Sequence, residues 1–258
     1  MPLPLVYVHG FIGHLRFPQL LTGMDPARVL SPDLIGYGAY AGQRPPSIAE
    51  QVTHLDGLIR QAFGEQPVVL AGHSGGAPLC IRFAERWPDR VAGLISAEGN
   101  LAPSDAFLSS RLAPMGPAQI QAWLDRAQAD PGVFLAPEHL RGDPVQLDRV
   151  REWLNHQSAT AVHAMARALL VETVHPGYAT AVSRVMAQTP TYLIQGELSS
   201  SALGVPTRLA AMAVETYMMP GVGHLMVLED PEAFARIVAS IVRALEAPVP
   251  RDFAIARD

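Results

Sequence analysis

The sequence predicts an α/β protein, with a mostly parallel sheet of about six strands and helices on both faces. Short apolar segments alternate with amphipathic helical segments along much of the chain. The strand candidates are continuously apolar, as in strands that are buried on both faces. In the stretch VVLAGHSGGAPLC, residues 68–80, an apolar strand passes into a helix through a serine enclosed by glycines. This last stretch also indicates where the chemistry takes place.

The predicted elements follow one another in a strand–helix order. The strand candidates cover residues 3–8, 28–31, 68–70, 91–97, 191–195 and 213–218. A helix runs to about residue 63 from Ser47, which forms a capping-box pattern with Glu50. A second helix begins at residue 77 and ends near Trp87, and an amphipathic helix covers residues 231–245. This alternation predicts parallel strands joined by helical crossovers.

Between about residues 101 and 188 this alternation disappears. The segment has a helical pattern and no strong strand candidate. Its expected apolar anchors are Trp123, Trp153, Met165 and Leu169. We therefore predict a helical cap over residues 101–188, inserted into a core made of residues 1–100 and 189–258. The last residues, 248–258, are expected to be a loose end.

Composition argues against several classes of function. The net charge is −5 and the chain contains no lysine, so we expect no nucleic-acid or anionic-membrane partner and no Schiff-base chemistry. No apolar run approaches the ~20 residues of a membrane span, and no signal peptide is apparent, which predicts a cytoplasmic protein. The lack of lysine and the many alanines and prolines indicate a GC-rich bacterial genome. The single cysteine, Cys80, is expected to be a buried core thiol.

Ser74 and His224 are the first candidate catalytic residues. Glycines at positions 72 and 76 leave room where the strand and the helix cross, with Ser74 at the apex in a strained conformation. The alternative is a glycine-rich turn with an incidental serine. A serine hydroxyl needs a base, and His224 lies in a glycine-rich loop after the last strand. The alternative for His224 is a loop histidine that caps the closing helix.

Five motifs occur in order: HGFIG (9–13), PDLIGYG (32–38), AGHSGG (71–76), RWPDRVAGLI (86–95) and GVGHLMVLEDPEAF (221–234). Together they resemble the α/β-hydrolase fold superfamily, in its capped branch of esterases, haloperoxidases and haloalkane dehalogenases. The resemblance implies that Ser74 is the nucleophile and His224 the base. It also places an oxyanion hole at the backbone N–H groups of Phe11 and Gly75. A serine where haloalkane dehalogenases carry aspartate points to acyl chemistry.

The sequence departs from the family pattern at two places. Family members begin with an antiparallel hairpin, but only eight residues precede His9, so this hairpin is expected to be missing. The family's acid normally follows the penultimate strand, three residues after a glycine. Ser199 occupies that position and cannot serve as the acid.

The acid partner of His224 must therefore lie elsewhere. Glu98 stands at the end of the fourth predicted strand, where some haloalkane dehalogenases have a glutamate. Its main rival is Glu197, two positions before Ser199 and with a longer side chain than aspartate. The third possibility is that no carboxylate serves, and that Glu98 ties the cap to the core through Asn100. We expect Glu98 to be the acid.

Other polar residues receive structural roles. We expect His9 to support the oxyanion loop, His73 to point away from the serine into the turn, and Asp33 to fix its own loop. His163 and His175 belong to the cap and are expected to be solvated, with a place in the pocket as the alternative. No spacing of histidine, cysteine and acidic residues indicates a metal site, and no cofactor is expected.

These expectations combine into a functional hypothesis. The sequence predicts a serine hydrolase that cleaves a carboxylic ester or thioester through an acyl-enzyme on Ser74. The apolar cap indicates a small-molecule substrate of medium size and largely hydrophobic character. Two alternatives remain open, because one fold hosts many reactions. They are a lyase, cyclase or acyltransferase of secondary metabolism, and a ligand-binding protein with slow turnover.

Overall fold

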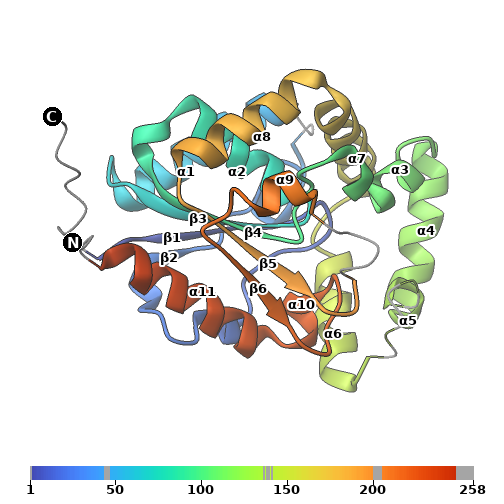
Figure 1. The fold of residues 1–258 in the computed structure, drawn as a ribbon. Helices are drawn as coiled ribbons and strands as arrows, with labels where there is room; N and C mark the ends of the chain where they lie inside the picture. Colours follow the sequence, from blue (N-terminus) through green and yellow to red (C-terminus); the bar gives the residue numbers. More distant parts are fainter. Residues whose placement is uncertain are drawn as a thin grey trace, which may run out of the picture.

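Six parallel strands form one central sheet in the computed structural model, which describes residues 2–43, 47–135, 137, 140, 142–199 and 205–247 (Figure 1). The strands are β1 (Leu5–Val8), β2 (Val29–Leu30), β3 (Val68–His73), β4 (Val91–Ala97), β5 (Thr191–Gly196) and β6 (Glu215–Met219). They lie in the order β2-β1-β3-β4-β5-β6, and every pair is parallel. The predicted fold class and its six strands are confirmed. The predicted loose end, residues 248–258, lies outside the described residues.

The carboxyl ends of the central strands meet at one edge of the sheet. Val8 pairs with Gly72 across β1 and β3, and His73 pairs with Ala97 across β3 and β4. All residues of β1 and β3 are buried, which explains why both read as continuously apolar. Loops that follow these strands therefore converge, and ligands of open parallel sheets bind at such an edge.

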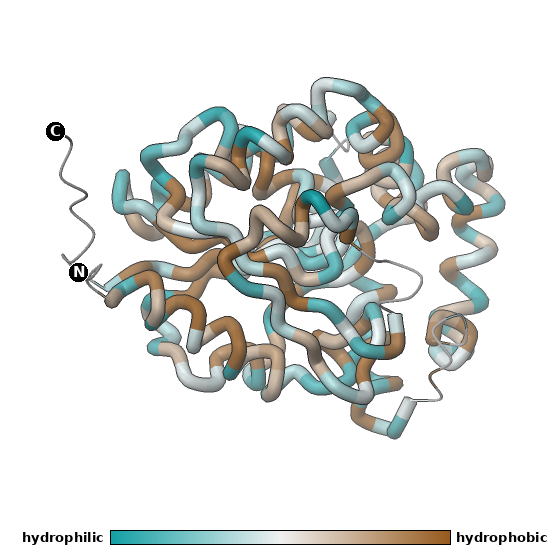
Figure 2. The backbone as a smooth tube through the Cα atoms, viewed as in Figure 1, coloured by the Kyte–Doolittle hydropathy of each residue, from teal (hydrophilic) through white to brown (hydrophobic). Residues whose placement is uncertain are grey.

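Helices cover both faces of the sheet (Figure 1). On one face lie α1 (Ile48–Phe63), α2 (Gly76–Arg86) and α8 (Pro176–Gln188), and on the other lies α11 (Pro231–Glu246). The predicted capping box is present at the start of α1, where Ser47 and Glu50 bond each other's backbone amides. Hydrophobic residues concentrate in the strands and on the inner sides of these helices (Figure 2). Burial of these apolar faces is the main stabilising contribution to the three-layer arrangement.

Between residues 101 and 188 the regular elements of the described ranges are all helical, apart from one isolated antiparallel bridge between Tyr37 and Gln157. Besides α8, the helices are α3 (Phe107–Leu112), α4 (Pro117–Ala129), α5 (Gly132–Leu135), α6 (Pro144–Leu154) and α7 (Ala159–Val174). Helix α7 packs on α3 and α4, whereas α8 packs on α2 beside the sheet. Three of the predicted anchors, Trp153, Met165 and Leu169, are buried. The division into a core and a separate cap stays a prediction.

Short elements complete the described chain. Two four-residue helices are α9 (Thr207–Ala210) and α10 (Met226–Glu229), and turns of 3-10 helix cover Pro18–Leu21, Pro26–Arg28, Gly38–Tyr40, Pro88–Arg90 and Pro103–Asp105.

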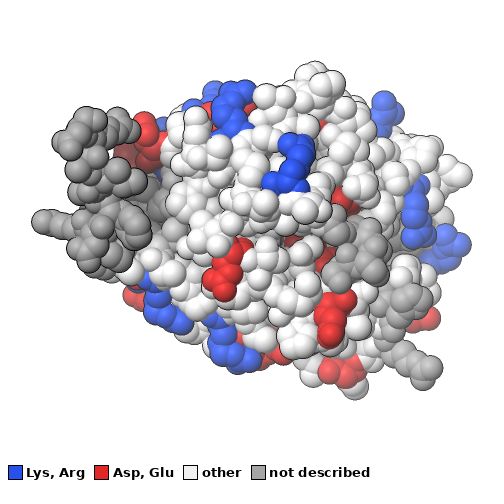
Figure 3. All heavy atoms as spheres, viewed as in Figure 1, with Lys and Arg blue, Asp and Glu red and all other residues white. Residues whose placement is uncertain are grey.

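Cys80 is buried in α2 as expected, and burial raises the pKa of its thiol well above the ordinary range. None of the helices in the described ranges combines the length and hydropathy needed to cross a bilayer. Basic and acidic side chains are both scattered over the face shown in Figure 3.

The turn between β3 and α2 is compressed where the helix crosses the strand ends. A Cβ atom on Gly76 would lie 2.1 Å from the carbonyl oxygen of Val8. A Cβ atom on Gly72 would lie 2.8 Å from the Cα atom of Ala77. Both distances are far shorter than a van der Waals contact, so a side chain at either position forces the helix away from the sheet.

We expect Gly76→Ala to destabilise the protein strongly, by about 3 kcal/mol, because its new methyl group collides with the rigid backbone of β1. Gly57 provides the matched control: it lies exposed inside α1, with nothing within 4 Å of a Cβ atom. Gly57→Ala should stabilise the protein by about 1 kcal/mol through helix propensity. Thermal and urea unfolding of both variants measure the difference. Equal effects of the two substitutions would contradict the close crossing.

Candidate active site

Ser74 stands at the apex of the turn between β3 and α2, with a backbone φ of 52°. A non-glycine residue in this left-handed region is strained, and here the surrounding backbone holds it in place. Its amide donates to the carbonyl of Ala97 at 3.0 Å, and its own carbonyl accepts from the amides of Ala77 and Asn100. The backbone of Ser74 is thus fixed from both sides, and its side chain lines a cavity.

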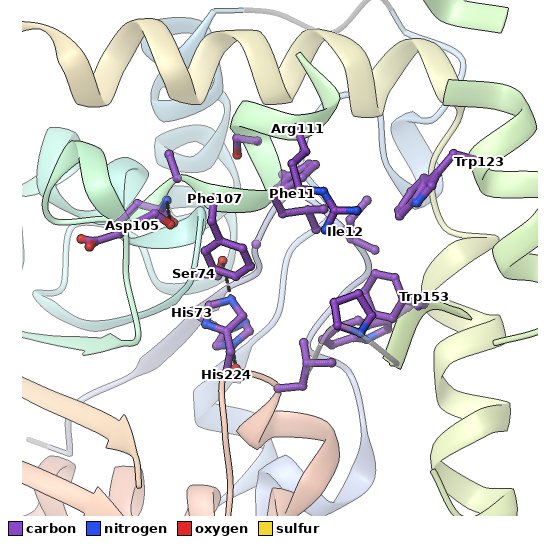
Figure 4. A pocket seen from close by; sticks show the side chains of 18 of the residues that line it. Phe11, Ile12, His73, Ser74, Asp105, Phe107, Arg111, Trp123, Trp153 and His224 are labelled. Atoms are coloured by element: carbon purple, nitrogen blue, oxygen red, sulfur yellow. Dashed lines mark hydrogen bonds between the residues drawn. The ribbon is translucent and has the colours of Figure 1, made fainter. Parts of the chain in front are cut away.

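His224 lies in the loop between β6 and α10, beside the Ser74 hydroxyl (Figure 4). Its Nε2 is 3.1 Å from Ser74 Oγ, and its Nδ1 is 2.9 Å from Oε2 of Glu98. A carboxylate can only accept hydrogen bonds, so Nδ1 carries the hydrogen and Nε2 presents a lone pair to the serine hydroxyl. The edge of the His224 ring also meets the ring of Phe107, with centroids 5.3 Å apart. The imidazole is therefore held in the tautomer that a general base requires.

Glu98 follows β4 directly and has a backbone φ of 42°. Its carboxylate is buried, which on its own would raise its pKa. The hydrogen bond and charge of His224, together with hydrogen bonds from the Ser199 hydroxyl and the Gly196 amide, more than offset burial and hold the pKa below its usual value. Glu98 is therefore ionised at neutral pH. Glu98 is thus a buried carboxylate whose charge is stabilised by hydrogen bonds from the protein in place of water.

The structure brings Glu98, and not its rival, to Nδ1 of His224. The Glu197 side chain is exposed, and its carboxylate accepts a hydrogen bond from the Gly221 amide at 2.8 Å. Ser199 donates its hydroxyl hydrogen to Glu98. The Asn100 side chain bonds the backbone carbonyl of Asp105.

The backbone amides of Phe11 and Gly75, which the family resemblance implies as an oxyanion hole, lie next to each other. A Cβ atom on Gly75 would be 3.4 Å from the Phe11 nitrogen. Within the described ranges, neither amide donates to a protein acceptor. His9 Nδ1 donates to the carbonyl of Gly10 at 2.6 Å, which orients the peptide group that carries the Phe11 amide. The Tyr37 hydroxyl donates to the backbone carbonyl of Phe11 at 2.8 Å.

From the sequence we expected His73 to point into the turn, but its side chain contacts the His224 loop. Its Nε2 donates to the backbone carbonyl of His224 at 2.9 Å, and the two rings lie 5.2 Å apart. Burial lowers the pKa of His73 to about 4, so its ring is neutral and can fix the His224 loop without adding charge. Sequence reasoning missed this contact because it joins residues at the ends of β3 and β6, which no local pattern relates.

A polar cluster connects the 101–188 segment to the loops after β1 and β2. Asp33 forms an ion pair with Arg16 at 2.8 Å and accepts from His156 Nε2 at 2.9 Å. It also accepts from the Ala39 amide at 3.0 Å, as its expected role in that loop requires. The amide of Gly13 donates to the side chain of Gln157 at 2.8 Å.

The candidate site opens into a cavity of about 320 Å³ between the strand-end loops and the 101–188 segment (Figure 4). Ser74, His73 and His224 line its floor. Its walls are mainly apolar and aromatic, and include Phe11, Ile12, Phe107, Leu108, Trp123, Phe134, Trp153 and Leu225. Neither His163 nor His175 lines it. Among the described residues, no group of three or more His, Cys, Asp or Glu side chains is arranged to hold a metal ion.

This combination of fold and site agrees with a comparison against protein-family models. The model of the alpha/beta hydrolase family matches residues 5–237. The chain belongs to the α/β-hydrolase family. Membership of this family supports an enzyme of the hydrolase type, and the chain shares its fold with solved esterases.

Individual relatives of this α/β hydrolase are more distant. The chain is 30% identical over 131 residues to lipase LipV of Mycobacterium tuberculosis, a match that covers 50% of this chain and 48% of LipV. It therefore spans about half the length of that relative. Among solved structures, an esterase from Thermogutta terrifontis superposes with a TM-score of 0.67 at 22% identity, covering 95% of this chain and 91% of the esterase. Proline iminopeptidase of Mycobacterium smegmatis gives 0.62 at 19% identity, covering 95% and 90%. These likenesses show the fold.

Three histidines near the site predict how stability depends on pH. Burial lowers the pKa of His9 to about 3, and those of His14 and His73 to about 4. In the unfolded chain each has a pKa of about 6.5. Between these values the unfolded chain binds protons that the folded protein does not, so stability is complete above about pH 6.5 and falls as the pH decreases toward the folded pKa values. Each histidine contributes a loss of up to about 1.4 kcal/mol per pH unit.

We expect His9→Asn to weaken this pH dependence, because the asparagine amide still offers a donor to Gly10 but does not titrate. His175→Asn is the matched control, since His175 is exposed and asparagine can also cap α8. Urea unfolding from about pH 7 to about pH 5 measures the free energy of unfolding. A slope for His9→Asn identical to those of the wild type and the control would contradict a neutral buried His9.

Proposed function

We propose that this α/β hydrolase cleaves carboxylic esters or thioesters of small, largely hydrophobic molecules through an acyl-enzyme on Ser74. The observation that carries the proposal is the hydrogen-bonded chain from Ser74 Oγ through the His224 ring to the Glu98 carboxylate, with steps of 3.1 and 2.9 Å. Its first member is strained, faces an apolar cavity and lies beside two amides that donate to no acceptor among the described residues. These are the parts that acyl transfer to a serine requires.

In the acylation step, Ser74 Oγ attacks the carbonyl carbon of the substrate while its proton passes to Nε2 of His224. The carbonyl oxygen becomes an oxyanion, which the amides of Phe11 and Gly75 stabilise by hydrogen bonds worth ~3 kcal/mol each. The ionised Glu98 stabilises the imidazolium that forms, since it lies 2.9 Å from Nδ1. His224 then donates its proton to the leaving alcohol or thiol, the bond to that group breaks, and the acyl group remains on Ser74.

Deacylation repeats these steps with water as the nucleophile. Nε2 of His224 accepts a proton from the water, whose oxygen attacks the acyl carbon, and the same two amides stabilise the second oxyanion. The proton returns to Ser74 Oγ as the ester bond to the enzyme breaks and the carboxylic acid is released. The apolar walls of the cavity favour an acyl or alcohol group of medium size, because they offer few polar partners.

We expect a fluorophosphonate to label Ser74 covalently, because the hydroxyl is activated by His224. Intact-mass spectrometry should show one adduct on the wild type and none on Ser74→Ala. Ser110, which is exposed on α3 and bonds the carbonyl of Phe107, provides the matched control. Ser110→Ala should label like the wild type. No adduct on the folded wild type would overturn the proposal and favour the ligand-binding alternative.

We expect Glu98→Gln to lower kcat by about 10³-fold or more, since glutamine cannot stabilise the imidazolium. Glu197→Gln is the matched control, and it should stay within a few-fold of the wild type, because the exposed Glu197 carboxylate accepts from the Gly221 amide and does not contact His224 Nδ1, which Glu98 occupies. Hydrolysis of p-nitrophenyl esters of graded chain length gives kcat for each variant. A Glu98→Gln enzyme with nearly normal kcat would show that Glu98 is not the acid.

The neighbouring Ser199 allows a rescue experiment. Its hydroxyl already contacts the Glu98 carboxylate, so an aspartate there brings a carboxylate close to Nδ1 of His224. The double variant Glu98→Ser with Ser199→Asp should regain part of the rate that Glu98→Ser loses. Failure of the rescue in a folded double variant would show that the position after β5 no longer reaches His224.

A further inference from the structure

Two arginines from the 101–188 segment line the same cavity as Ser74. Arg111 belongs to α3 and Arg126 to α4. In Figure 4 the side chain of Arg111 extends from α3 toward the space beside Ile12 and Trp123. The proposed hydrolysis uses neither guanidinium, so their presence in a largely apolar cavity calls for a separate function.

Helical spacing directs both arginines toward the cavity. Arg111 lies three residues after Leu108 on α3, and Arg126 lies three residues after Trp123 on α4. Residues three apart share a helix face, and both of these neighbours also line the cavity. Both arginines are exposed residues, so each lies at the mouth of the cavity, beside a residue of its apolar wall.

The charges of these two arginines are not neutralised by any described carboxylate. The ion pairs of the described ranges use other arginines, among them Arg16 with Asp33 and Arg82 with Glu172. This contrast is notable in a protein with a net charge of −5. Two cations thus face the substrate space of an otherwise acidic protein.

Among the described residues, Asp105 is the one acidic residue that lines this cavity. Its carboxylate already accepts hydrogen bonds from the protein. One oxygen accepts from the Ala102 amide at 2.8 Å and the other from the Ser104 hydroxyl at 3.0 Å. Burial raises the pKa of Asp105 above its ordinary value. Asp105 therefore does not supply the counterion for the two arginines.

We propose that Arg111 and Arg126 bind an anionic group, a carboxylate or a phosphate, that the substrate carries away from its reacting ester. The inference rests on the proposed function of Ser74. Guanidinium groups bind both oxyanions with paired hydrogen bonds, and they remain charged at any physiological pH. The substrate is then a half-ester or an acyl compound with an apolar middle part, which the aromatic walls accommodate, and one charged end.

The test compares esters of one chain length that differ at the distal end. The probes are the mono-p-nitrophenyl ester of octanedioic acid, its neutral methyl ester, and p-nitrophenyl 8-phosphonooxyoctanoate. We expect Arg111→Gln and Arg126→Gln each to lower kcat/KM about tenfold more for an anionic ester than for the neutral ester. The two anionic probes distinguish carboxylate from phosphate, since the natural group should show the larger selectivity loss.

Arg151→Gln is the matched control, because Arg151 is exposed on α6, pairs with Asp148 and does not line the cavity. It removes the same charge and should leave the selectivity for the anionic esters as in the wild type. Equal losses for neutral and anionic esters in the Arg111 and Arg126 variants, or the same selectivity loss in Arg151→Gln, would overturn the inference.

A binding measurement separates this inference from the proposed function. Trp123 and Trp153 line the cavity, so tryptophan fluorescence of Ser74→Ala can report binding of octanedioate against its neutral diamide. Preference for octanedioate that both arginine substitutions abolish supports the anion site, even if no ester is hydrolysed and no serine is labelled. Equal binding of the two compounds overturns the anion site, even if Ser74-dependent hydrolysis is found.

Discussion

The candidate site depends on the close crossing of α2 over the ends of β1 and β3. Gly72 and Gly76 allow the backbones to approach to distances that no side chain permits. Because the chain must reverse within a few residues, Ser74 adopts a left-handed conformation and its hydroxyl faces the cavity. The same crossing places the Gly75 amide at the start of α2, beside the loop that follows β1. One packing constraint thus positions both the hydroxyl and the neighbouring amide donors.

The second determinant is the burial of a carboxylate next to His224. An ionised group is stable inside a protein only when hydrogen bonds replace its water. Glu98 meets this requirement through His224, Gly196 and Ser199, which come from two separate parts of the chain, the end of β5 and the loop after β6. Because β4 and β5 are neighbours in the sheet, Glu98 after β4 and Ser199 after β5 lie side by side. The serine after β5 has thereby become a hydrogen-bond donor to the acid that follows β4.

In the proposed reaction, the reacting groups and the walls of the cavity come from two different parts of the fold. The loops at the sheet edge carry Ser74, His224 and the two amides, and all of them are held by backbone or buried hydrogen bonds. The walls of the cavity and its two arginines come mostly from helices between β4 and β5. These helices contact the edge loops through side chains such as His156 and Gln157, and Phe107 of α3 contacts the His224 ring.

The sequence by itself determined the six strands, the turn at Ser74 and the choice of His224, because hydrophobic runs, glycines and chain order are local signals. It also favoured Glu98, yet Glu197 remained a rival until the sheet placed one beside the histidine ring and the other beside Gly221. Tertiary structure alone decided two features. It placed His73 against the His224 loop, and it placed Arg111 and Arg126 beside the cavity. Both features depend on how elements that are distant in the sequence pack together. The local sequence around a residue does not specify which element packs against it.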